Sequence, residues 1–272
     1  MQNKEKPHIY AGGDIVGTHN LVDAVNDGKV ASWFMHKQIG QKYGIDYGEE
    51  PKLPGFFTEI DLVDISSTLA GVKFENPYGL ASAPPATSYP MIRRAFEMGW
   101  GFAVTKTFVL DKDEIVNVAP RIFKGTSDIL RKEPSFSNIE LISEKRAKYW
   151  VDGAKELKKD FPNKIIVGSI MAAYNKQDWL DLAKMCVDAQ FDVVELNLSC
   201  NHGMPDKGMG RACSDVPEVV EDIVRTVCSV YKGPVFVKLS PNSTITEQIT
   251  ASTLKAGGKG VSATNTMFSF MD

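Results

Sequence analysis

Short apolar runs alternate with longer amphipathic segments along most of this chain. The apolar runs cover residues 78–83, 102–107, 165–171, 193–198, 235–239 and 260–263. The amphipathic segments between them lie near residues 91–97, 143–160, 177–188, 217–231 and 247–255. Short apolar runs are typical of buried strands, and amphipathic segments of this length are typical of helices. Because neighbouring parallel strands need a crossover connection such as a helix, the alternation predicts an α/β fold with a parallel sheet. Pro217 is expected in the first turn of its helix, and Gly257-Gly258 at a helix C-cap.

The number of runs leaves two architectures open. A closed (β/α)8 barrel of TIM-barrel type needs eight strands and about 250 residues. Here the chain reaches Asp272 just after the sixth run. The alternatives are an open doubly wound sheet and a barrel truncated after about six strands. The last residues, 267–272, carry neither a cap nor a polar tail, which favours the truncated barrel.

Residues 41–56 are rich in glycine, proline and acidic side chains and predict a linker. The preceding segment, residues 1–40, contains the turn Gly12-Gly13-Asp14 between a short apolar run and an amphipathic segment. A strand, a glycine turn and a helix in this order direct helix amides at an anion, although an ordinary βα turn has the same pattern. Residues 57–272 form the predicted β/α domain.

Composition excludes several classes of function. The net charge of -3 and the pI near 5.9 argue against a nucleic-acid partner. The polar N-terminus resembles neither a signal nor a transit peptide, and no window has the roughly 18 apolar residues of a membrane span, so we expect a cytoplasmic protein. The four cysteines, Cys186, Cys200, Cys213 and Cys228, form no C-x-x-C pair. No metal site is therefore predicted, and three of these thiols are expected to be inert.

Polar side chains follow most of the predicted strands. They are Ser82, Lys106, Thr107, Asn197, Ser199, Cys200, Lys238, Asn265 and Thr266. The carboxyl ends of parallel strands usually carry the reacting groups of α/β enzymes. Asparagine amides both donate and accept hydrogen bonds, so several of them match the carbonyl and N–H edge of a pyrimidine.

Lys106 and Lys238 are embedded in apolar runs, whereas most lysines extend to the surface. A buried ammonium needs a partner, and an anionic reduced flavin would supply one. Cys200 follows its strand directly, beside His202 and ahead of a segment with Gly203, Gly208 and Gly210. A thiol whose pKa is about 8.5 can donate a proton near neutral pH, although many such cysteines are small buried apolar residues. His202 either tunes this thiol or is an ordinary loop residue.

These residues lie in segments that resemble the dihydropyrimidine dehydrogenase family, flavoproteins that reduce uracil and thymine with NADPH. The most specific segments are "NPYGLASAPPATSYPMIRRAFEMGWGFAVTKTF", "SNIELISEK", "ELNLSC", "KGMGRAC", "KLSPN" and "SATNT". The dihydroorotate dehydrogenases of class 1 share only the barrel, the asparagine positions and a cysteine base. The resemblance covers nearly the whole chain.

The resemblance implies that residues 57–272 form an FMN-binding barrel and residues 1–40 the end of an FAD domain, with Asp14 as an FAD contact. It implies FMN contacts from Ser82, Lys106, Thr107 and Lys238. It implies pyrimidine contacts from Asn138, Asn197, Leu198, Ser199, Asn265 and Thr266. Hydride would pass from N5 of FMN to C6 of the ring while Cys200 protonates C5, and closure of the segment from Cys200 to Cys213 would exclude water. This reaction is the first step of pyrimidine catabolism.

The resemblance also implies NADPH, FAD and 4Fe-4S clusters whose complete sites lie outside this chain, and a homodimer. The segment 124–138 is interpreted as a loop before Asn138. With only six strands, the first and sixth would be open edges, so we expect the chain alone to bind FMN weakly or not at all. Two further hypotheses stay open: an inactive truncated fragment, and a dihydroorotate-type dehydrogenase.

Overall fold

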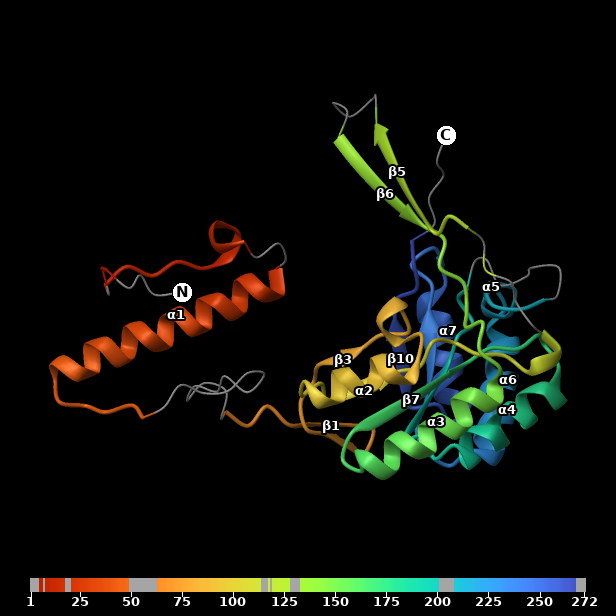
Figure 1. Ribbon diagram of the computed structural model, residues 1–272. Helices are drawn as coiled ribbons and strands as arrows, with labels where there is room; N and C mark the ends of the chain where they lie inside the picture. Colours follow the sequence, from red (N-terminus) through yellow and green to blue (C-terminus); the bar gives the residue numbers. More distant parts are fainter. Residues whose placement is uncertain are drawn as a thin grey trace. The chain divides into compact units, whose positions relative to one another are not determined.

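The computed structural model describes residues 5–6, 8–17, 21–48, 63–113, 117, 119–127, 133–200 and 208–267. The chain divides into two compact units, residues 1–64 and 65–272. The first unit contains η1 (Gly13–Val16) and α1 (Leu21–Lys42) (Figure 1). The strand expected before the glycine turn is a single bridge residue, Tyr10. The Gly13 amide donates to Asp27 Oδ2 at 2.9 Å, so this amide is occupied by a side chain of α1.

The second unit is built on one parallel sheet, as the alternating pattern predicts. Its strands are β3 (Gly79–Leu80), β4 (Phe102–Val104), β7 (Ile165–Ile170), β8 (Val193–Leu196), β9 (Val235–Leu239) and β10 (Gly260–Ala263). The order is β10-β9-β8-β7-β4-β3, with every neighbouring pair parallel. Ser262 Oγ on β10 donates to Glu195 Oε2 on β8 at 2.7 Å, although β9 lies between these strands. The sheet is therefore curled, with an inner and an outer face.

Helices cover the outer face of this sheet (Figure 1). They are α2 (Tyr89–Glu97), α3 (Ala147–Asp160), α4 (Lys176–Asp188), α6 (Pro217–Val230) and α7 (Thr246–Lys255). Short helices are η3 (Pro84–Ala86), η4 (Asp111–Asp113) and α5 (Arg211–Ser214). Pro217 is the first residue of α6, and Gly257 has a φ of +102° just after α7, so both terminus predictions are confirmed. No helix in the described part of the chain is long and apolar enough to cross a membrane.

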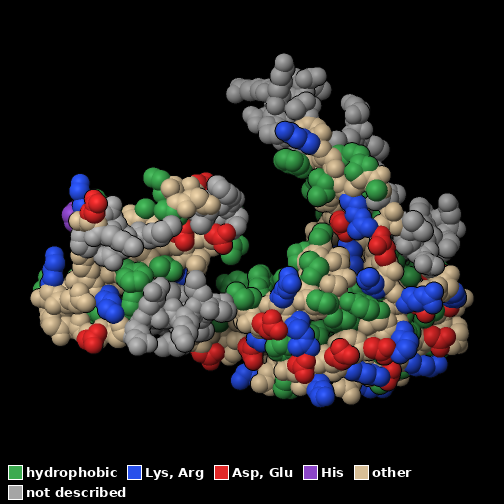
Figure 2. All heavy atoms as spheres, in the orientation of Figure 1, with side chains coloured by type: hydrophobic (Ala, Val, Ile, Leu, Met, Phe, Trp, Pro, Cys, Tyr) green, Lys and Arg blue, Asp and Glu red, His purple; other side chains and the backbone are tan. Residues whose placement is uncertain are grey.

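The strands alternate between the two faces with the period of two that a pleated strand imposes. On the outer face, Ile166 and Ile170 of β7 join the core formed with the helices, together with Val194 and Leu196 of β8. Large side chains of the helices, including Trp150 and Trp179, are fully buried in this core. Figure 2 shows charged side chains of both signs interspersed on the exposed surface of the same unit.

The inner face changes from apolar to polar along the strands. At its beginning, Ile165 and Val193 belong to a smaller core that includes Phe74 of the hairpin β1 (Ser67–Leu69) and β2 (Val72–Phe74). Further along, Ser169 and Glu195 lie opposite each other on β7 and β8, and both are buried. The polar half of the inner face thus lies at the carboxyl ends of the strands.

The segment that we interpreted as a loop before Asn138 is instead an antiparallel hairpin. It consists of β5 (Ile122–Ser127) and β6 (Glu133–Asn138), and Ile122 pairs with Asn138 at its base (Figure 1). The sequence pattern missed it because the segment is rich in glycine, serine and charged residues rather than apolar ones. The base of this hairpin lies at the carboxyl end of the sheet, where Ile122 and Asn138 help to line a cavity.

Candidate active site

A cavity of about 210 Å³ lies at the carboxyl ends of the parallel strands. The predicted site residues that line it are Ser82, Lys106, Thr107, Asn138, Asn197, Cys200, Lys238, Asn265 and Thr266. The fold therefore brings together side chains from five strand ends and from the β5–β6 hairpin. The cavity is also lined by Ile122, Ala83, Pro84, Glu140, Leu141 and Ile142, which sequence reasoning did not select.

Lys106 is paired by a protein carboxylate. Its side chain is buried, and its Nζ donates to Glu140 Oε2 at 2.9 Å. The expectation that a flavin alone would pair this ammonium is therefore incomplete. Glu140 follows Asn138 by two residues, so the period of two along β6 and its continuation could have indicated a second inward polar side chain.

Lys238 differs from Lys106 although both line the same cavity. Lys238 is half-buried, and its ammonium makes neither an ion pair nor a hydrogen bond with the described residues. A half-buried ammonium without a protein partner favours binding of an anionic or acceptor group of a ligand. Of the two predicted lysines, Lys238 is therefore the one whose ammonium can still donate hydrogen bonds to a ligand.

A continuous hydrogen-bond network joins the other predicted residues. Thr107 Oγ1 accepts from Asn197 Nδ2 at 2.9 Å, and the Thr107 amide donates to Ser82 Oγ at 3.0 Å. Asn265 Nδ2 donates to Asn197 Oδ1 at 3.3 Å and to Ser199 Oγ at 3.0 Å. These contacts link the ends of β3, β4, β8 and β10, so the side chains are held in place before any ligand binds.

Two predicted substrate residues do not line the cavity. Leu198 is fully buried in the core between helices and sheet, so its side chain faces away from the polar residues. Ser199 is fully buried as well, and its hydroxyl lies 3.2 Å from Asn197 Oδ1. Asp14 lies in η1 of the first unit, where its side chain is exposed.

Cys200 lies at the cavity beside an apolar cluster. It is 7 % exposed and packs with Leu141, Met171 and Met209, among others. Its carbonyl accepts from the Arg211 amide at 3.1 Å. His202 and the rest of residues 201–207 lie outside the described residues, and so does the part of the predicted closing segment that they form.

Gly210, in the predicted closing segment from Cys200 to Cys213, lies directly against the Cys200 backbone. Its φ is +61°, which favours glycine, and a Cβ at this position would lie 2.5 Å from the Cys200 carbonyl oxygen. Gly208 also has a positive φ, +65°, but a Cβ at this position would have no atom of the described residues within 4 Å. The "KGMGRAC" sequence therefore combines a conformational requirement with a close approach to the candidate proton donor.

The other three cysteines have the properties of inert thiols. None of the four cysteines forms a disulfide. Burial raises the pKa of Cys213 to about 11 and also raises the pKa of Cys186. Burial raises the pKa of Cys228 too, against the opposing effect of Lys232. Thiols with raised pKa values carry little thiolate near neutral pH and react slowly.

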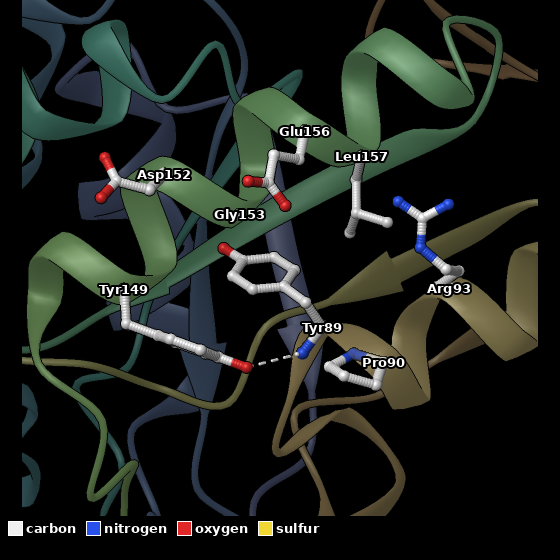
Figure 3. Close-up of a pocket in the computed structure, with 8 residues that line it drawn as sticks. All are labelled: Tyr89, Pro90, Arg93, Tyr149, Asp152, Gly153, Glu156 and Leu157. Atoms are coloured by element: carbon white, nitrogen blue, oxygen red, sulfur yellow. Dashed lines mark hydrogen bonds between the residues drawn. The ribbon is translucent and has the colours of Figure 1, made fainter.

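A second cavity, of about 400 Å³, lies between α2 and α3, away from the polar strand ends (Figure 3). Tyr89 and Arg93 of α2 line it from one side, and Tyr149, Gly153 and Glu156 of α3 from the other. The Tyr89 amide donates to the Tyr149 hydroxyl at 3.0 Å, which caps α2 where the side chain of its N-cap residue makes no capping bond. This contact gives the groove a structural role in joining two helices.

The curled parallel sheet and the polar cavity at its carboxyl end define a barrel-type α/β enzyme. The sequence pattern of the family described as "Dihydroorotate dehydrogenase" matches residues 64–272. The chain therefore belongs to the dihydroorotate dehydrogenase family, a family of oxidoreductases whose members are flavin (FMN) enzymes.

Several curated proteins are similar to the chain. The chloroplastic dihydropyrimidine dehydrogenase (NADP(+)) of Arabidopsis thaliana is 36 % identical over 213 residues, which cover 76 % of this chain and 50 % of that protein. The NAD-dependent dihydropyrimidine dehydrogenase subunit PreA of Escherichia coli (strain K12) is 34 % identical over 75 % of this chain and 48 % of its own length. The catalytic subunit of dihydroorotate dehydrogenase B (NAD(+)) of Thermoplasma volcanium is 35 % identical over 66 % of this chain and 55 % of its own. The chain thus spans about half the length of these relatives.

Solved structures support the fold. The ligand-free DHODH of Eimeria tenella superimposes with a TM-score of 0.60 at 19 % sequence identity, covering 85 % of this chain and 67 % of that one. The same enzyme in complex with ferulenol gives a TM-score of 0.62 at 17 % identity, covering 88 % and 66 % of the two chains. The fold is therefore an α/β fold of TIM-barrel type, with the six described strands forming a curled half-barrel.

Proposed function

We propose that this chain carries the FMN and pyrimidine site of an enzyme that reduces uracil and thymine to their 5,6-dihydro forms. The observation that carries the proposal is the single cavity lined by Lys238, Cys200, Asn197, Asn265 and Thr107. It combines an ammonium that pairs with no described residue, a thiol and fixed amides, which are the groups that an electron-rich flavin and a cyclic imide require. The similarity to two dihydropyrimidine dehydrogenases supports the same substrate class.

The donor set at the cavity fits a flavin. Ser82, Lys106, Thr107 and Lys238 are the residues that would hold FMN, and all four line the cavity. Bound FMN supplies the hydride for reduction of the ring. The role of Lys238 is electrostatic, because its ammonium favours negative charge on whatever it contacts. Lys106 contributes less to this effect because Glu140 already neutralises it.

The pyrimidine would be held by Asn138, Asn197, Asn265 and Thr266, with Ser199 and Leu198 supporting them from behind the cavity wall. Hydrogen bonds from these amides orient the ring and stabilise charge that develops on its carbonyl groups. Cys200 holds a proton at Sγ and delivers it to the ring carbon next to the one that receives hydride, C5. The apolar cluster around Cys200 limits access of competing water to this proton.

Electrons would come from NADPH through an FAD, and 4Fe-4S clusters would belong to the same longer assembly. In this proposal Asp14 contacts the FAD, the active protein is a cytoplasmic homodimer, and residues 1–40 belong to the FAD domain. The similarity to the Arabidopsis relative, whose name specifies NADP(+), supports the choice of NADPH.

A half-reaction tests this proposal without the remainder of a longer protein. The chain is saturated with FMN, reduced with dithionite, freed of excess reductant and mixed with uracil. We expect flavin reoxidation with formation of dihydrouracil, and a rate that falls about 100- to 10,000-fold in Cys200→Ala, the range typical of a lost general acid. Cys213→Ala is the matched control and retains the wild-type rate. Unchanged reduction of uracil by Cys200→Ala would mean that another group supplies the proton.

Dihydroorotate oxidation is the second candidate function, and the family match favours it. Orotate carries a carboxylate that uracil lacks, and Lys238 is the cavity cation that could bind it. The same flavin-loaded chain is therefore mixed, in its oxidised form, with dihydroorotate. Reduction of the flavin by dihydroorotate, without reoxidation of the reduced flavin by uracil, would replace the first proposal by the second.

A further inference from the structure

A buried carboxyl group lies below the candidate site, and the proposed reaction does not use it. Glu195 of β8 is only 5 % exposed and has no ion pair among the described residues. Its Oε1 accepts from Ser169 Oγ at 2.8 Å, and its Oε2 accepts from Ser262 Oγ at 2.7 Å. Both serine hydroxyls thus direct their single protons at Glu195.

Ser169 connects Glu195 to the cavity wall. Its oxygen lies 2.8 Å from Thr107 Oγ1, and both side chains are buried. Because the Ser169 proton faces Glu195, Thr107 must be the donor in this contact. Thr107 Oγ1 then has only lone pairs for its other neighbours, so it accepts from Asn197 Nδ2 at 2.9 Å and from Ser82 Oγ, which lies at 3.3 Å.

The hydrogen bonds to Asn197 Oδ1 require the same orientation of the Asn197 side-chain amide. The Ser199 backbone N–H, which can only donate, points at Asn197 Oδ1 at 3.3 Å. Asn265 Nδ2 donates to the same oxygen, and the Thr266 amide fixes Asn265 by donating to its Oδ1 at 2.8 Å. The Asn197 oxygen is thus occupied inside the wall, whereas its second N–H bonds to no described residue. Asn197 lines the cavity, so it presents a donor there.

We propose that Glu195 is a positioning residue that acts through Ser169 and Thr107 to hold Asn197 as a hydrogen-bond donor to the ligand. The inference deepens the proposed function and rests on it for the identity of the ligand as a pyrimidine. A donor at Asn197 matches a ring carbonyl and opposes a ring amino group. The buried carboxylate therefore selects keto pyrimidines such as uracil over amino pyrimidines such as cytosine.

The orientation of Asn197 is measurable without any ligand. In the full chain labelled with 15N-asparagine, the side-chain amide of Asn197 should give nuclear Overhauser effects to Thr107. Ser169→Ala frees the Thr107 proton, which can then be donated to Asn197, so these effects should weaken and a second, minor amide orientation should appear, although the Ser199 N–H still opposes it. Ser262→Ala is the matched control, since it removes the other hydroxyl of Glu195 but leaves the route to Asn197 intact. If both serines had only a structural role, Ser169→Ala and Ser262→Ala would show the same change in the orientation of the Asn197 amide.

The affinities for uracil and cytosine test whether this orientation of Asn197 selects keto pyrimidines. Isothermal titration of the FMN-saturated full chain with uracil and with cytosine gives a ratio of affinities, and we expect Ser169→Ala to lower this ratio about three- to ten-fold, the effect of one hydrogen bond. Ser262→Ala should leave the ratio unchanged. An Asn197 amide directed at Ser199 in the wild type, or equal ratios for both variants, would overturn the inference. If neither base binds the wild type, the proposed function fails, whereas the amide measurement still decides the role of Glu195.

Discussion

The outer and inner faces of the parallel sheet use the same strands but differ in what stabilises them. On the outer face, Ile166, Ile170 and Val194 pack against helices, and burial of apolar surface supplies the free energy. On the inner face near the carboxyl ends, Ser169 and Glu195 are equally buried but depend on hydrogen bonds to each other. Burying polar groups costs free energy unless each finds a partner.

This difference separates stability from function within one sheet. The outer face tolerates changes that conserve volume, because dispersion and burial are not directional. The inner face requires particular donors and acceptors at particular positions, as is typical of a site organised before its ligand arrives. Variants on the outer face should therefore change the free energy of unfolding, and variants at the cavity should change binding more than stability.

The largest expected effect belongs to the outer core. Trp150 of α3 is fully buried, and its Nε1 donates to Ser143 Oγ at 2.9 Å. Trp150→Ala should lower the free energy of unfolding by about 3–5 kcal/mol, because it leaves a large cavity. Urea denaturation measures this change. Trp100→Ala, at a tryptophan that is 39 % exposed, is the control and should cost far less; equal losses would contradict the assignment of the core.

The two lysines of the cavity should differ in how much they contribute to the free energy of unfolding. Lys106→Ala leaves Glu140 with only the more distant Arg121, at 4.0 Å, and should lower the free energy of unfolding by about 1–3 kcal/mol. Lys238→Ala removes a side chain without a described protein partner and should change it by no more than about 0.5 kcal/mol. Thermal or urea melts of both variants compare them directly. A larger destabilisation by Lys238→Ala would show that this ammonium has a structural role.

Glycine substitutions test the contact behind Cys200. Gly208→Ala should cost about 1 kcal/mol, because only its positive φ opposes a side chain. Gly210→Ala adds a clash with the Cys200 carbonyl and should cost more, on the order of 2–3 kcal/mol. Denaturation of the two variants gives the difference. Identical values would mean that the backbone near Cys200 shifts freely.

The smallest expected effect is a difference in the reactivity of the buried thiols between the native and the unfolded chain. Burial raises the pKa of Cys213 to about 11, so at pH 8 its thiol stays almost entirely protonated. Cys186, whose pKa burial also raises, should behave in the same way. Mass spectrometry after brief iodoacetamide treatment should find both residues unmodified in the native chain and modified in urea. Labelling of either residue before unfolding would place it in a more open environment.

The sequence predicted the outer face well. Apolar runs and amphipathic segments identified all six strands of the sheet and the five long helices around it, because burial against helices leaves a periodic pattern. The same pattern missed the β5–β6 hairpin, whose strands contain glycine, serine and proline. It also gave no sign of the β1–β2 hairpin, because its strands are only three residues long.

The structure brings Thr107 and Asn197, which come after β4 and β8, and Lys238, which lies near the end of β9, to one cavity, while their roles stay predictions. Sequence reasoning did not select Glu140 and Glu195, whose partners lie far away in the sequence. Glu140 pairs with Lys106, and Glu195 is held by serines from two other strands. The period of two could have indicated Glu140 as an inward side chain, but neither composition nor periodicity identifies these distant partners.

Binding of FMN most directly tests the central claim that the polar inner face, rather than the groove between α2 and α3, is the ligand site. Quenching of FMN fluorescence is titrated with wild type, Lys238→Ala and the groove variant Arg93→Ala, and uracil is then added at saturating FMN. We expect Lys238→Ala to lose about ten-fold or more in affinity for FMN, the effect of one charge-assisted contact. Arg93→Ala should bind FMN as the wild type does, and uracil should perturb the flavin spectrum of both. Full FMN affinity in Lys238→Ala together with a loss in Arg93→Ala would contradict the account.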